Sequence, residues 1–241
     1  MIGKINSIDT MGLVDGPGIR VVVFMQGCPL RCKFCHNPET WNFKGEAKEF
    51  TPEELVKFVL NYKNYFDDNG GVTFSGGEPL AQSEFLKETL KLLKICNIHT
   101  CIDTSGFGDD YEELLDYVDL VLYDIKALNN DKYIDITSQK IDKTLKFLNT
   151  CQAKKKKMWI RQVIVPGIND NIEYINELAK VIRPLENIEK VELLPYHTMG
   201  VTKYKELGIP YKLEGINDMD KEKCKNFEKI LNALIKNKKL D

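Results

Sequence analysis

Two kinds of hydrophobic spacing alternate along the chain, one typical of buried strands and one typical of amphipathic helices. Residues 19–25, "IRVVVFM", form a continuous β-branched and aromatic run, which predicts a strand buried on both faces. Residues 51–66 carry apolar side chains at helical spacing, after a capping threonine, Thr51, and a proline at the first helical position. Glu54 completes a capping box with Thr51, so this second segment is predicted to be a helix.

The same alternation continues along the rest of the sequence. Further strands are predicted over residues 71–79, 98–106, 120–126, 158–167 and 191–197, and further helices over residues 83–95, 109–118, 172–182 and 227–234. Strands separated by helices predict a parallel sheet of repeated βα units. About six such units are too few for a closed barrel of eight, and they predict an open, partial (β/α)6 TIM-like barrel. No linker or repeat divides the sequence, so we expect a single domain over residues 1–241.

Composition is ordinary for a soluble globular protein, with 43% hydrophobic and 29% charged residues. The 34 basic and 36 acidic side chains give a net charge of -2, which implies no general attraction to nucleic acid. The sequence has no signal-peptide pattern and no apolar run that could span a bilayer, so a cytoplasmic location without membrane contact is expected. In that reducing compartment the seven cysteines are predicted to be thiols or metal ligands rather than disulfides.

Polar residues gather at the ends of the predicted strands. They are Gly76, Gly77 and Glu78 after one strand, Asp103 and Thr104 after the next, Asp124 and Lys126 after a third, and His197 after the last. In barrels of parallel strands the C-terminal strand ends carry the chemistry. These positions therefore predict one site at one rim of the sheet.

Three closely spaced cysteines, Cys28, Cys32 and Cys35, follow the first buried strand, and His36 comes directly after them. One interpretation is a structural zinc site with three sulfur ligands and one nitrogen ligand. The other is a [4Fe-4S] cluster held at three corners, with its fourth iron open to another ligand. Zinc sites favour paired C-x2-C units, and the remaining cysteines show no such pairing, so the spacing favours the cluster. A histidine adjacent to a ligating cysteine also points poorly toward the same metal.

The cysteine motif C-x3-C-x2-C after one strand, with "SGGEP" after the next, resembles the radical S-adenosylmethionine (SAM) enzymes. A wider set of segments is similar, in order, to the family of pyruvate formate-lyase activating enzymes. These segments are "VDGPGIR", "QGC…RC.FCHNP.TW", "GGVTFSGGEPL", "HTCIDTSGF", "WIRQVIVPG" and "VELLPYH". The similarity spans nearly the whole chain. Residues 36–50 are too few for the ferredoxin-like insert that activases of several other glycyl radical enzymes carry there.

The resemblance implies a reaction. The amino and carboxylate groups of SAM would bind the iron that lacks a cysteine, and a fourth cysteine would block that position. Reductive cleavage would give a 5′-deoxyadenosyl radical, which takes a hydrogen atom from a backbone glycine of pyruvate formate-lyase. Reduced flavodoxin or ferredoxin would supply the electron, and the enzyme would be a monomer.

The resemblance also implies roles for individual residues. Cys28, Cys32 and Cys35 would be the catalytic cysteines, because they would bind the cluster that cleaves SAM. The SAM-binding residues would be Phe34, His36, Gly76, Gly77, Glu78, Asp124, Ile125, Lys126 and His197. A monovalent cation, Na⁺ or K⁺, would be bound by Asp103, Thr104 and Asp124. The partner's glycine loop would meet Asp15 and Arg161.

Three alternatives stay open. The chain could activate a different glycyl radical enzyme, or it could be a zinc protein without enzymatic activity. It could also be a radical enzyme acting on a small molecule. That last alternative is disfavoured, because no added domain would close over a small substrate, whereas an open barrel suits a protein loop.

Overall fold

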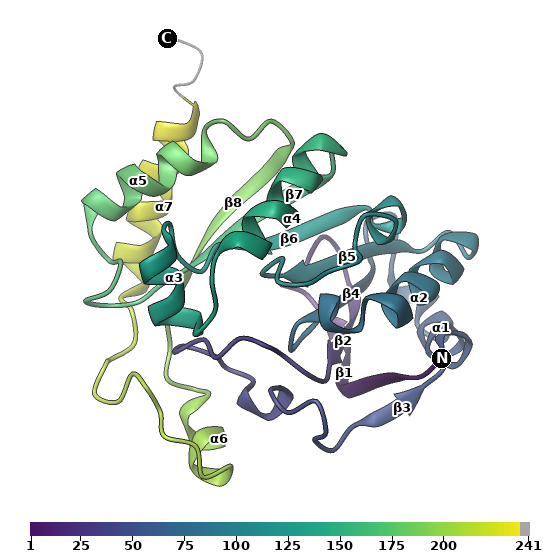
Figure 1. Cartoon of the computed structure of the whole chain (residues 1–241). Coiled ribbons are helices and arrows are strands. Elements are labelled where there is room, and N and C mark those ends of the chain that lie inside the picture. Colours follow the sequence, from purple (N-terminus) through teal and green to yellow (C-terminus); the bar gives the residue numbers. More distant parts are fainter. Residues whose placement is uncertain (237–241) are drawn as a thin grey trace.

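A computed structural model describes residues 1–236 of the chain, in which a single eight-stranded sheet forms the centre of the fold (Figure 1). Its strands are β1 (Gly3–Gly12), β2 (Arg20–Met25), β3 (Lys48–Phe50), β4 (Gly71–Gly76), β5 (His99–Thr104), β6 (Leu120–Asp124), β7 (Lys157–Ile164) and β8 (Ile188–Pro195). They are arranged in the order β3-β1-β2-β4-β5-β6-β7-β8.

The six strands β2, β4, β5, β6, β7 and β8 run parallel, which confirms the predicted open barrel of six βα units. Two antiparallel strands that were not predicted from the sequence pattern, β1 and β3, extend the sheet beyond β2. The first and last strands of this order, β3 and β8, do not pair with each other, so the sheet stays open.

The helices are α1 (Pro52–Leu60), α2 (Ser83–Ile95), α3 (Asn130–Thr137), α4 (Asp142–Ala153), α5 (Ile172–Ile182), α6 (Val201–Glu206) and α7 (Lys221–Lys236). Short 3₁₀ helices cover Pro38–Thr40, Lys63–Tyr65, Pro79–Gln82 and Leu114–Tyr117. The predicted capping box is present, because Thr51 Oγ1 accepts from the Glu54 amide and Glu54 accepts from the Thr51 amide. The helix predicted over residues 51–66 ends earlier, at Leu60, and the one predicted over residues 109–118 is only a 3₁₀ turn.

Alternation along each parallel strand separates two environments. On β5 and β6, Ile102 and Val121 belong to the large apolar core together with residues of the helices. Their neighbours along the two strands, Cys101 and Leu122, belong to a separate, smaller cluster on the other face of the sheet. Successive side chains of a strand point to opposite faces, so the residues two positions after Cys101 and Leu122 lie on the same face of the sheet as these two. Those residues are Asp103 and Asp124, and this periodicity carries polar side chains into the mouth of the barrel.

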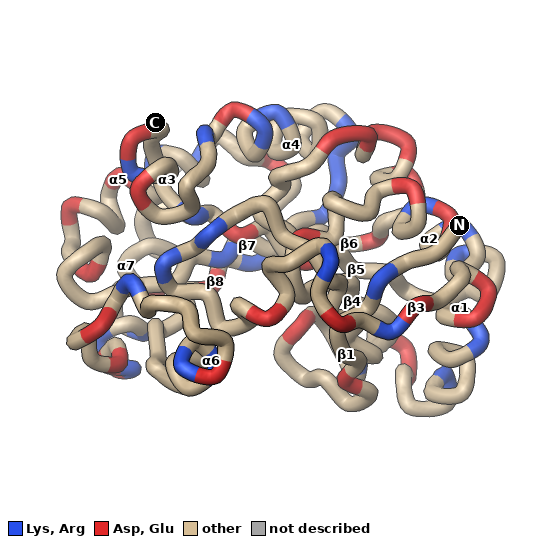
Figure 2. Tube along the Cα trace, turned by 60° about the horizontal axis from the view of Figure 1, so that its bottom comes forward, with Lys and Arg blue, Asp and Glu red and all other residues tan. Residues whose placement is uncertain are grey.

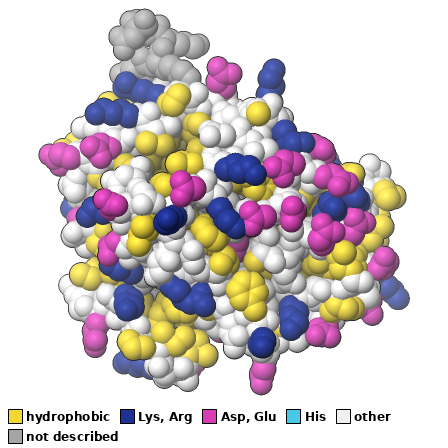
Figure 3. All heavy atoms as spheres, viewed as in Figure 1, with side chains coloured by type: hydrophobic (Ala, Val, Ile, Leu, Met, Phe, Trp, Pro, Cys, Tyr) yellow, Lys and Arg dark blue, Asp and Glu magenta, His cyan; other side chains and the backbone are white. Residues whose placement is uncertain are grey.

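Acidic and basic residues are both distributed over the whole fold (Figure 2). On the face drawn in Figure 3 they are interspersed with apolar side chains. Among the residues that the structure describes, no helix combines the length and apolar character needed to cross a membrane.

Candidate active site

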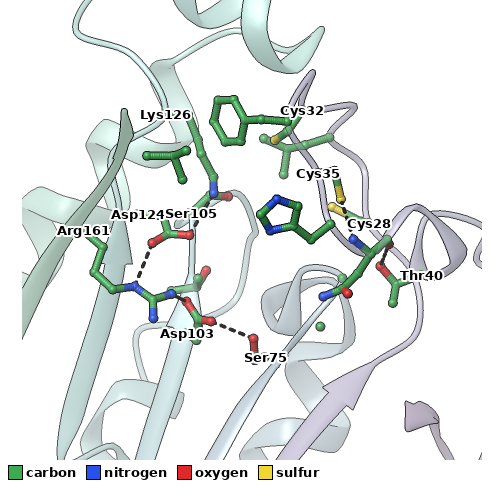
Figure 4. A pocket seen from close by; sticks show the side chains of 18 of the residues that line it. Cys28, Cys32, Cys35, Thr40, Ser75, Asp103, Ser105, Asp124, Lys126 and Arg161 are labelled. Atoms are coloured by element: carbon green, nitrogen blue, oxygen red, sulfur yellow. Dashed lines mark hydrogen bonds and ion pairs between the residues drawn. The ribbon is translucent and has the colours of Figure 1, made fainter. Parts of the chain in front are cut away.

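A pocket of about 230 Å³ lies at the C-terminal ends of the parallel strands. The cysteines of the loop after β2 lie on one side of it, and acidic and basic side chains from β5, β6 and β7 lie on the other (Figure 4). The predicted site residues that line it are Cys28, Cys32, Phe34, Cys35, His36, Gly76, Gly77, Asp103, Thr104, Asp124, Lys126 and Arg161. Four predicted residues do not line it, namely Asp15, Glu78, Ile125 and His197.

The cysteine loop is held in place by the C-terminal end of α3. The amide of Arg31 donates to the carbonyl of Thr137 at 2.8 Å, and the amide of Lys33 donates to the carbonyl of Ile136 at 3.0 Å. Carbonyls in the last turn of a helix have no partner within the helix, so they are available to orient such a loop. The side chain of Gln139 adds a third bond, to the carbonyl of Pro29 at 2.9 Å.

All seven cysteines are free, and the three of the loop are protonated thiols unless a metal binds them. Burial raises the pKa of Cys28 and of Cys35, and it raises the pKa of Cys32 to about 12. Because only a thiolate binds iron, the metal must displace these protons. Three sulfur donors on one short loop, with no fourth protein sulfur in the pocket lining, fit a [4Fe-4S] cluster with one open iron. In residues 1–236 no three His, Cys, Asp or Glu side chains are grouped around a position for a single metal ion.

Two histidines stack beside the cysteine loop. The rings of His36 and His197 have centroids 3.9 Å apart and planes within 18° of each other. Nε2 of His36 lies 3.1 Å from the carbonyl oxygen of His197. Burial lowers the pKa of His36, and the neighbouring His197 lowers it further. Nδ1 of His197 is buried without a hydrogen-bond partner among the described residues, and such an atom is suited to bind a polar group of a ligand.

The glycine turn after β4 packs directly on the start of the cysteine loop. The amide of Gly77 donates to the carbonyl of Met25 at 2.9 Å, and the amide of Glu78 donates to the carbonyl of Gly27 at 3.0 Å. Gly76 has a φ of +101°, and a Cβ on it would collide with the backbone of Met25. Only glycine allows both this conformation and this approach, so the turn presents its backbone to the pocket.

The Glu78 carboxylate is buried behind this turn, and four donors from the chain bind it. Thr104 Oγ1 lies 2.5 Å from Oε1 and the Leu80 amide lies 3.2 Å from the same oxygen. The hydroxyl and the amide of Ser105 donate to Oε2 at 2.7 and 3.1 Å. Burial raises the pKa of Glu78, and these hydrogen bonds oppose that increase. Glu78 therefore ties the glycine turn to the end of β5.

Charged side chains form a connected network on the opposite wall. Arg161 donates from Nε to Asp124 Oδ1 at 3.0 Å and from Nη2 to Asp103 Oδ1. The second oxygen of each aspartate also accepts, from Lys126 Nζ at 2.8 Å in one case and from Ser75 Oγ at 2.7 Å in the other. Burial alone would raise the pKa of Asp124, but Arg161 and Lys126 hold it at about 2. Asp124 is therefore ionised at all physiological pH values.

Lys126 connects this network with the cysteine loop. Its ammonium lies 5.7 Å from the centre of the Phe34 ring, within cation–π distance. Burial would lower the pKa of Lys126, but the Asp124 carboxylate raises it, so the side chain is a cation facing the pocket. Figure 4 shows Lys126 and Asp124 across the cavity from Cys28 and Cys35.

Glu78 and His197 are described above, and the other two predicted residues outside the pocket lining are Ile125 and Asp15. Ile125 is buried in the apolar core, and its amide donates to the carbonyl of Arg161 at 2.9 Å. Asp15 lies on the loop between β1 and β2, and its pKa is raised by burial and by Asp103 but lowered by Arg161. Asp15 therefore interacts with the charges of the network although it lies outside the pocket lining.

Ser75 and Ser105 in the pocket lining, and Tyr204 outside it, were not predicted from the sequence. Ser75 precedes the glycine turn and could have been found, because strand alternation puts it on the inner face. Ser105 follows Thr104 and binds Glu78. Tyr204 on α6 donates to the carbonyl of Cys35 at 2.9 Å and packs edge-on against Trp41. No local signal links Tyr204 with the cysteines, because about 170 residues separate them.

Comparison with known proteins agrees with this geometry. The family pattern described as "Radical SAM superfamily" matches residues 22–181. A pyruvate formate-lyase-activating enzyme from Clostridium pasteurianum is 54% identical over 98% of this chain and 99% of its own. One from Staphylococcus epidermidis is 46% identical over 95% of each chain.

Solved structures are similar in fold at lower sequence identity. A domain of pyruvate-formate lyase-activating enzyme from Bacteroides vulgatus matches 68% of this chain and 94% of its own, with 24% identity and a TM-score of 0.56. SuiB from Streptococcus suis, bound to precursor peptide SuiA, matches 90% of this chain and 46% of its own, with 17% identity and a TM-score of 0.69. From its pocket, its fold and its relatives together, the chain belongs to the radical SAM superfamily and, within it, to the family of pyruvate formate-lyase-activating enzymes.

Proposed function

We propose that this chain cleaves SAM reductively at a [4Fe-4S] cluster and uses the 5′-deoxyadenosyl radical to take a hydrogen atom from a backbone glycine of pyruvate formate-lyase. One observation carries the proposal. A three-cysteine loop faces a network of Asp103, Asp124, Lys126 and Arg161 across a single pocket, in a chain 54% identical over nearly its full length to an enzyme named for that activation.

Cys28, Cys32 and Cys35 would hold the cluster. When bound, the cluster supplies the electron that breaks a carbon–sulfur bond of SAM. The backbone of Gly76 and Gly77 lines the pocket and is suited to accept from the amino group of SAM, because no side chain intervenes there. Glu78 would act by holding this turn, since its carboxylate already accepts four hydrogen bonds.

The opposite wall would bind the remaining parts of SAM. Lys126 is a buried cation in the lining and would attract the carboxylate group of SAM, with Asp124 fixing the position of its ammonium. The stacked rings of His36 and His197, together with Phe34, would contact the adenosine portion. Ile125 would contribute only through its backbone, because its side chain is buried in the apolar core. The unpartnered Nδ1 of His197 supports a polar contact with that portion.

A monovalent cation, Na⁺ or K⁺, forms a further part of the proposal, with Asp103, Thr104 and Asp124 as ligands. Each of the four carboxylate oxygens of the two aspartates already has one partner in the chain, and each retains a second lone pair. Hard oxygen donors suit such a cation. The cation would share the aspartates with Arg161 rather than replace it.

The partner's glycine segment would enter the pocket from the open side of the barrel and would meet Asp15 and Arg161. We further propose that reduced flavodoxin or ferredoxin supplies the electron, and that the enzyme acts as a monomer in the cytoplasm. Free cysteines suit that compartment. Residues 1–241 would form one radical SAM domain without a ferredoxin-like insert.

The test is anaerobic incubation of the reduced, cluster-loaded chain with SAM and pyruvate formate-lyase. Electron paramagnetic resonance should detect a glycyl radical on the partner, and a partner in which alanine replaces the target glycine should give none. A cluster-loaded chain that cleaves SAM but forms no radical on this partner, and does form one on another glycyl radical enzyme, would favour the alternative activase. A colourless protein that retains zinc would favour the structural zinc site.

A further inference from the structure

The segment between β8 and α7 leaves the sheet and returns to the same point. The amide of Met219 donates to the carbonyl of Tyr196 at 2.8 Å, and the amide of Thr198 donates to Asp218 Oδ1 at 2.7 Å. These bonds join the two ends of residues 198–218, and α6 lies between them, apart from the sheet (Figure 1). None of residues 198–218 lines the pocket, so the segment influences the site only through the residues that it contacts.

The helix α6 packs against the end of the cysteine loop. The hydroxyl of Tyr204 donates to the carbonyl of Cys35 at 2.9 Å, and the Tyr204 side chain is only 2% exposed. Gly200, the residue before α6, lies so close to the next loop residue that a Cβ on it would be 3.1 Å from Cα of His36. The helix is therefore seated on the backbone at the third cysteine.

A lysine of the same helix continues this contact. Lys203 Nζ donates to Asn37 Oδ1 at 3.1 Å and also pairs with the carboxylate of Glu39. Asn37 precedes the 3₁₀ helix Pro38–Thr40, but its side chain makes no capping bond to that helix. The Asn37 side chain is instead bound by α6.

Between these two contacts lies a hydrogen bond to a predicted cluster ligand. The backbone amide of Asn37 donates to Sγ of Cys35 at 3.4 Å. Burial raises the pKa of Cys35, and this bond opposes the increase, because an N–H group stabilises negative charge on sulfur. Tyr204 fixes the carbonyl at one end of this turn, and Lys203 fixes the side chain at the other end.

We infer that Lys203 and Tyr204 are positioning residues that raise the reduction potential of the cluster by holding the Asn37 amide on the sulfur of Cys35. Hydrogen bonds to the sulfurs are one of the factors that set the potential of an iron–sulfur cluster, together with charge and solvent exposure. At a higher potential a given electron donor reduces a larger fraction of the cluster. The inference rests on the proposed function for the presence of the cluster, but not for the identity of the protein partner.

The lysine gives the sharpest variant. Lys203→Met removes the donor to Asn37, and because the Lys203 side chain is 40% exposed, the change opens no cavity in the core. Lys205→Met is its matched control, since Lys205 is an exposed cation of the same helix. Both variants lose one positive charge, but only the first loses the bond to Asn37.

The tyrosine gives a second, independent variant. Tyr204→Phe removes only the hydroxyl that binds the carbonyl of Cys35. Tyr211→Phe is its control, because the Tyr211 ring packs on the Tyr204 ring with centroids 4.8 Å apart. The hydroxyl of Tyr211 lies 2.7 Å from that of Tyr196 and makes this bond instead of one to the cysteine loop.

The measurement is a potentiometric titration of the cluster-loaded protein, followed by visible absorption and electron paramagnetic resonance, without SAM and without a protein partner. In Lys203→Met and Tyr204→Phe the ratio of reduced to oxidised cluster at a fixed potential should fall roughly threefold or more, which lowers the midpoint by about 28 mV for a one-electron couple. The two controls should keep the midpoint of the unaltered chain. Iron and sulfide are measured on the same samples, so that an incomplete cluster is not mistaken for a lowered potential.

A double variant separates the hydrogen bond from the charge. Lys203→Met combined with Glu39→Gln has the net charge of the unaltered chain, because it removes one charge of each sign. The inference predicts that this protein keeps the lowered midpoint of Lys203→Met. A potential that depends on charge alone would return to the unaltered value.

Two results would overturn the inference, and Lys203→Met decides it alone if Tyr204→Phe does not retain its iron. If Lys203→Met has the midpoint of Lys205→Met, or if the double variant returns to the unaltered midpoint, Lys203 does not act through Asn37. An unaltered chain that binds no four-iron cluster would contradict the proposed function, and the inference would fail with it. The unaltered chain is titrated in the same series, so the two failures are distinguishable.

Discussion

Arg161 and Asp124 are register partners on neighbouring strands, and Arg161 Nε donates to Asp124 Oδ1 at 3.0 Å. The same guanidinium also donates to Asp103 on β5, so it spans three adjacent strands at the mouth of the barrel. Only the planar fork of arginine binds two carboxylates in this way. The pair therefore fixes both the charge and the geometry of the wall that faces the cysteines.

Removal of Arg161 should make SAM binding depend strongly on the monovalent cation. Arg161→Ala leaves two buried carboxylates without their shared counter-charge, which costs about 3–5 kcal/mol of stability and repels the carboxylate of SAM. A small cation at the aspartates would partly replace the lost charge. Calorimetric titration should therefore show that Arg161→Ala binds SAM more weakly than the unaltered chain. When K⁺ and Na⁺ are exchanged for N-methylglucamine, the SAM affinity of the variant should fall by a larger factor than that of the unaltered chain. Asp124→Asn should reduce that cation dependence, and equal dependence in all three proteins would remove the cation from the account.

Glu78→Gln should be more harmful than its small change in shape suggests. Four donors point at the Glu78 carboxylate, so the amide group of glutamine must face donors with a donor. We expect a loss of about 2–3 kcal/mol in the free energy of unfolding and weaker SAM binding through displacement of the glycine turn. Denaturant unfolding and SAM titration measure the two effects, with Glu84→Gln on the exposed face of α2 as the control. Unchanged SAM affinity in a destabilised Glu78 variant would show that the turn keeps its place without Glu78.

Loss of any one loop cysteine should abolish the cluster. Cys28→Ala, Cys32→Ala and Cys35→Ala each leave two thiolates, which hold a cubane poorly, so iron content and visible absorption should fall to background after anaerobic reconstitution. Cys96→Ala is the best control, because Cys96 is only partly buried and lies at the end of α2. Equal iron loss in the Cys96 variant would contradict the assignment of ligands.

Stability should decrease below about pH 6.5, in part because of His99. Burial and Arg20 lower the pKa of His99 below its value of 6.5 in the unfolded chain, so the unfolded state binds more protons as the pH falls. The contribution of neutral His99 to the free energy of unfolding is complete above pH 6.5, and it is lost as the pH falls from 6.5 through the lower pKa of His99 in the folded chain. The melting temperature should therefore drop less between pH 7.5 and pH 6.0 in His99→Gln than in the unaltered chain. Parallel pH dependence in the two proteins would show that His99 does not carry this effect.

Hydrophobic periodicity was sufficient to predict the parallel strands, which are buried on both faces, and the amphipathic helices α1, α2, α5 and α7, which bury one continuous face. Strand β1 was missed because polar residues such as Asn6 and Asp9 interrupt it, and its pairing with β2 decides its structure. Helices α3 and α4 have weaker apolar faces, yet α3 supports the cysteine loop through its backbone carbonyls, which no side-chain pattern reveals.

For the site, the strand ends and the family resemblance together predicted many of the residues that line the pocket, whereas the hydrogen-bond partners of these residues could not be read from the sequence. The four donors to Glu78 and the sharing of Arg161 between two aspartates depend on which strands become neighbours. The full burial of Arg20 was not predicted, although Arg20 lies within the predicted strand 19–25, because an arginine side chain is usually exposed.

The most direct test of the central claim follows the hydrogen atom itself. Pyruvate formate-lyase prepared with deuterium on the α-carbons of its glycines is incubated anaerobically with the reduced, cluster-loaded chain and SAM. The account predicts that the 5′-deoxyadenosine formed along with the glycyl radical carries one deuterium, measured by mass spectrometry. A glycyl radical accompanied by 5′-deoxyadenosine without deuterium would contradict it, because the atom removed from glycine would then have gone elsewhere.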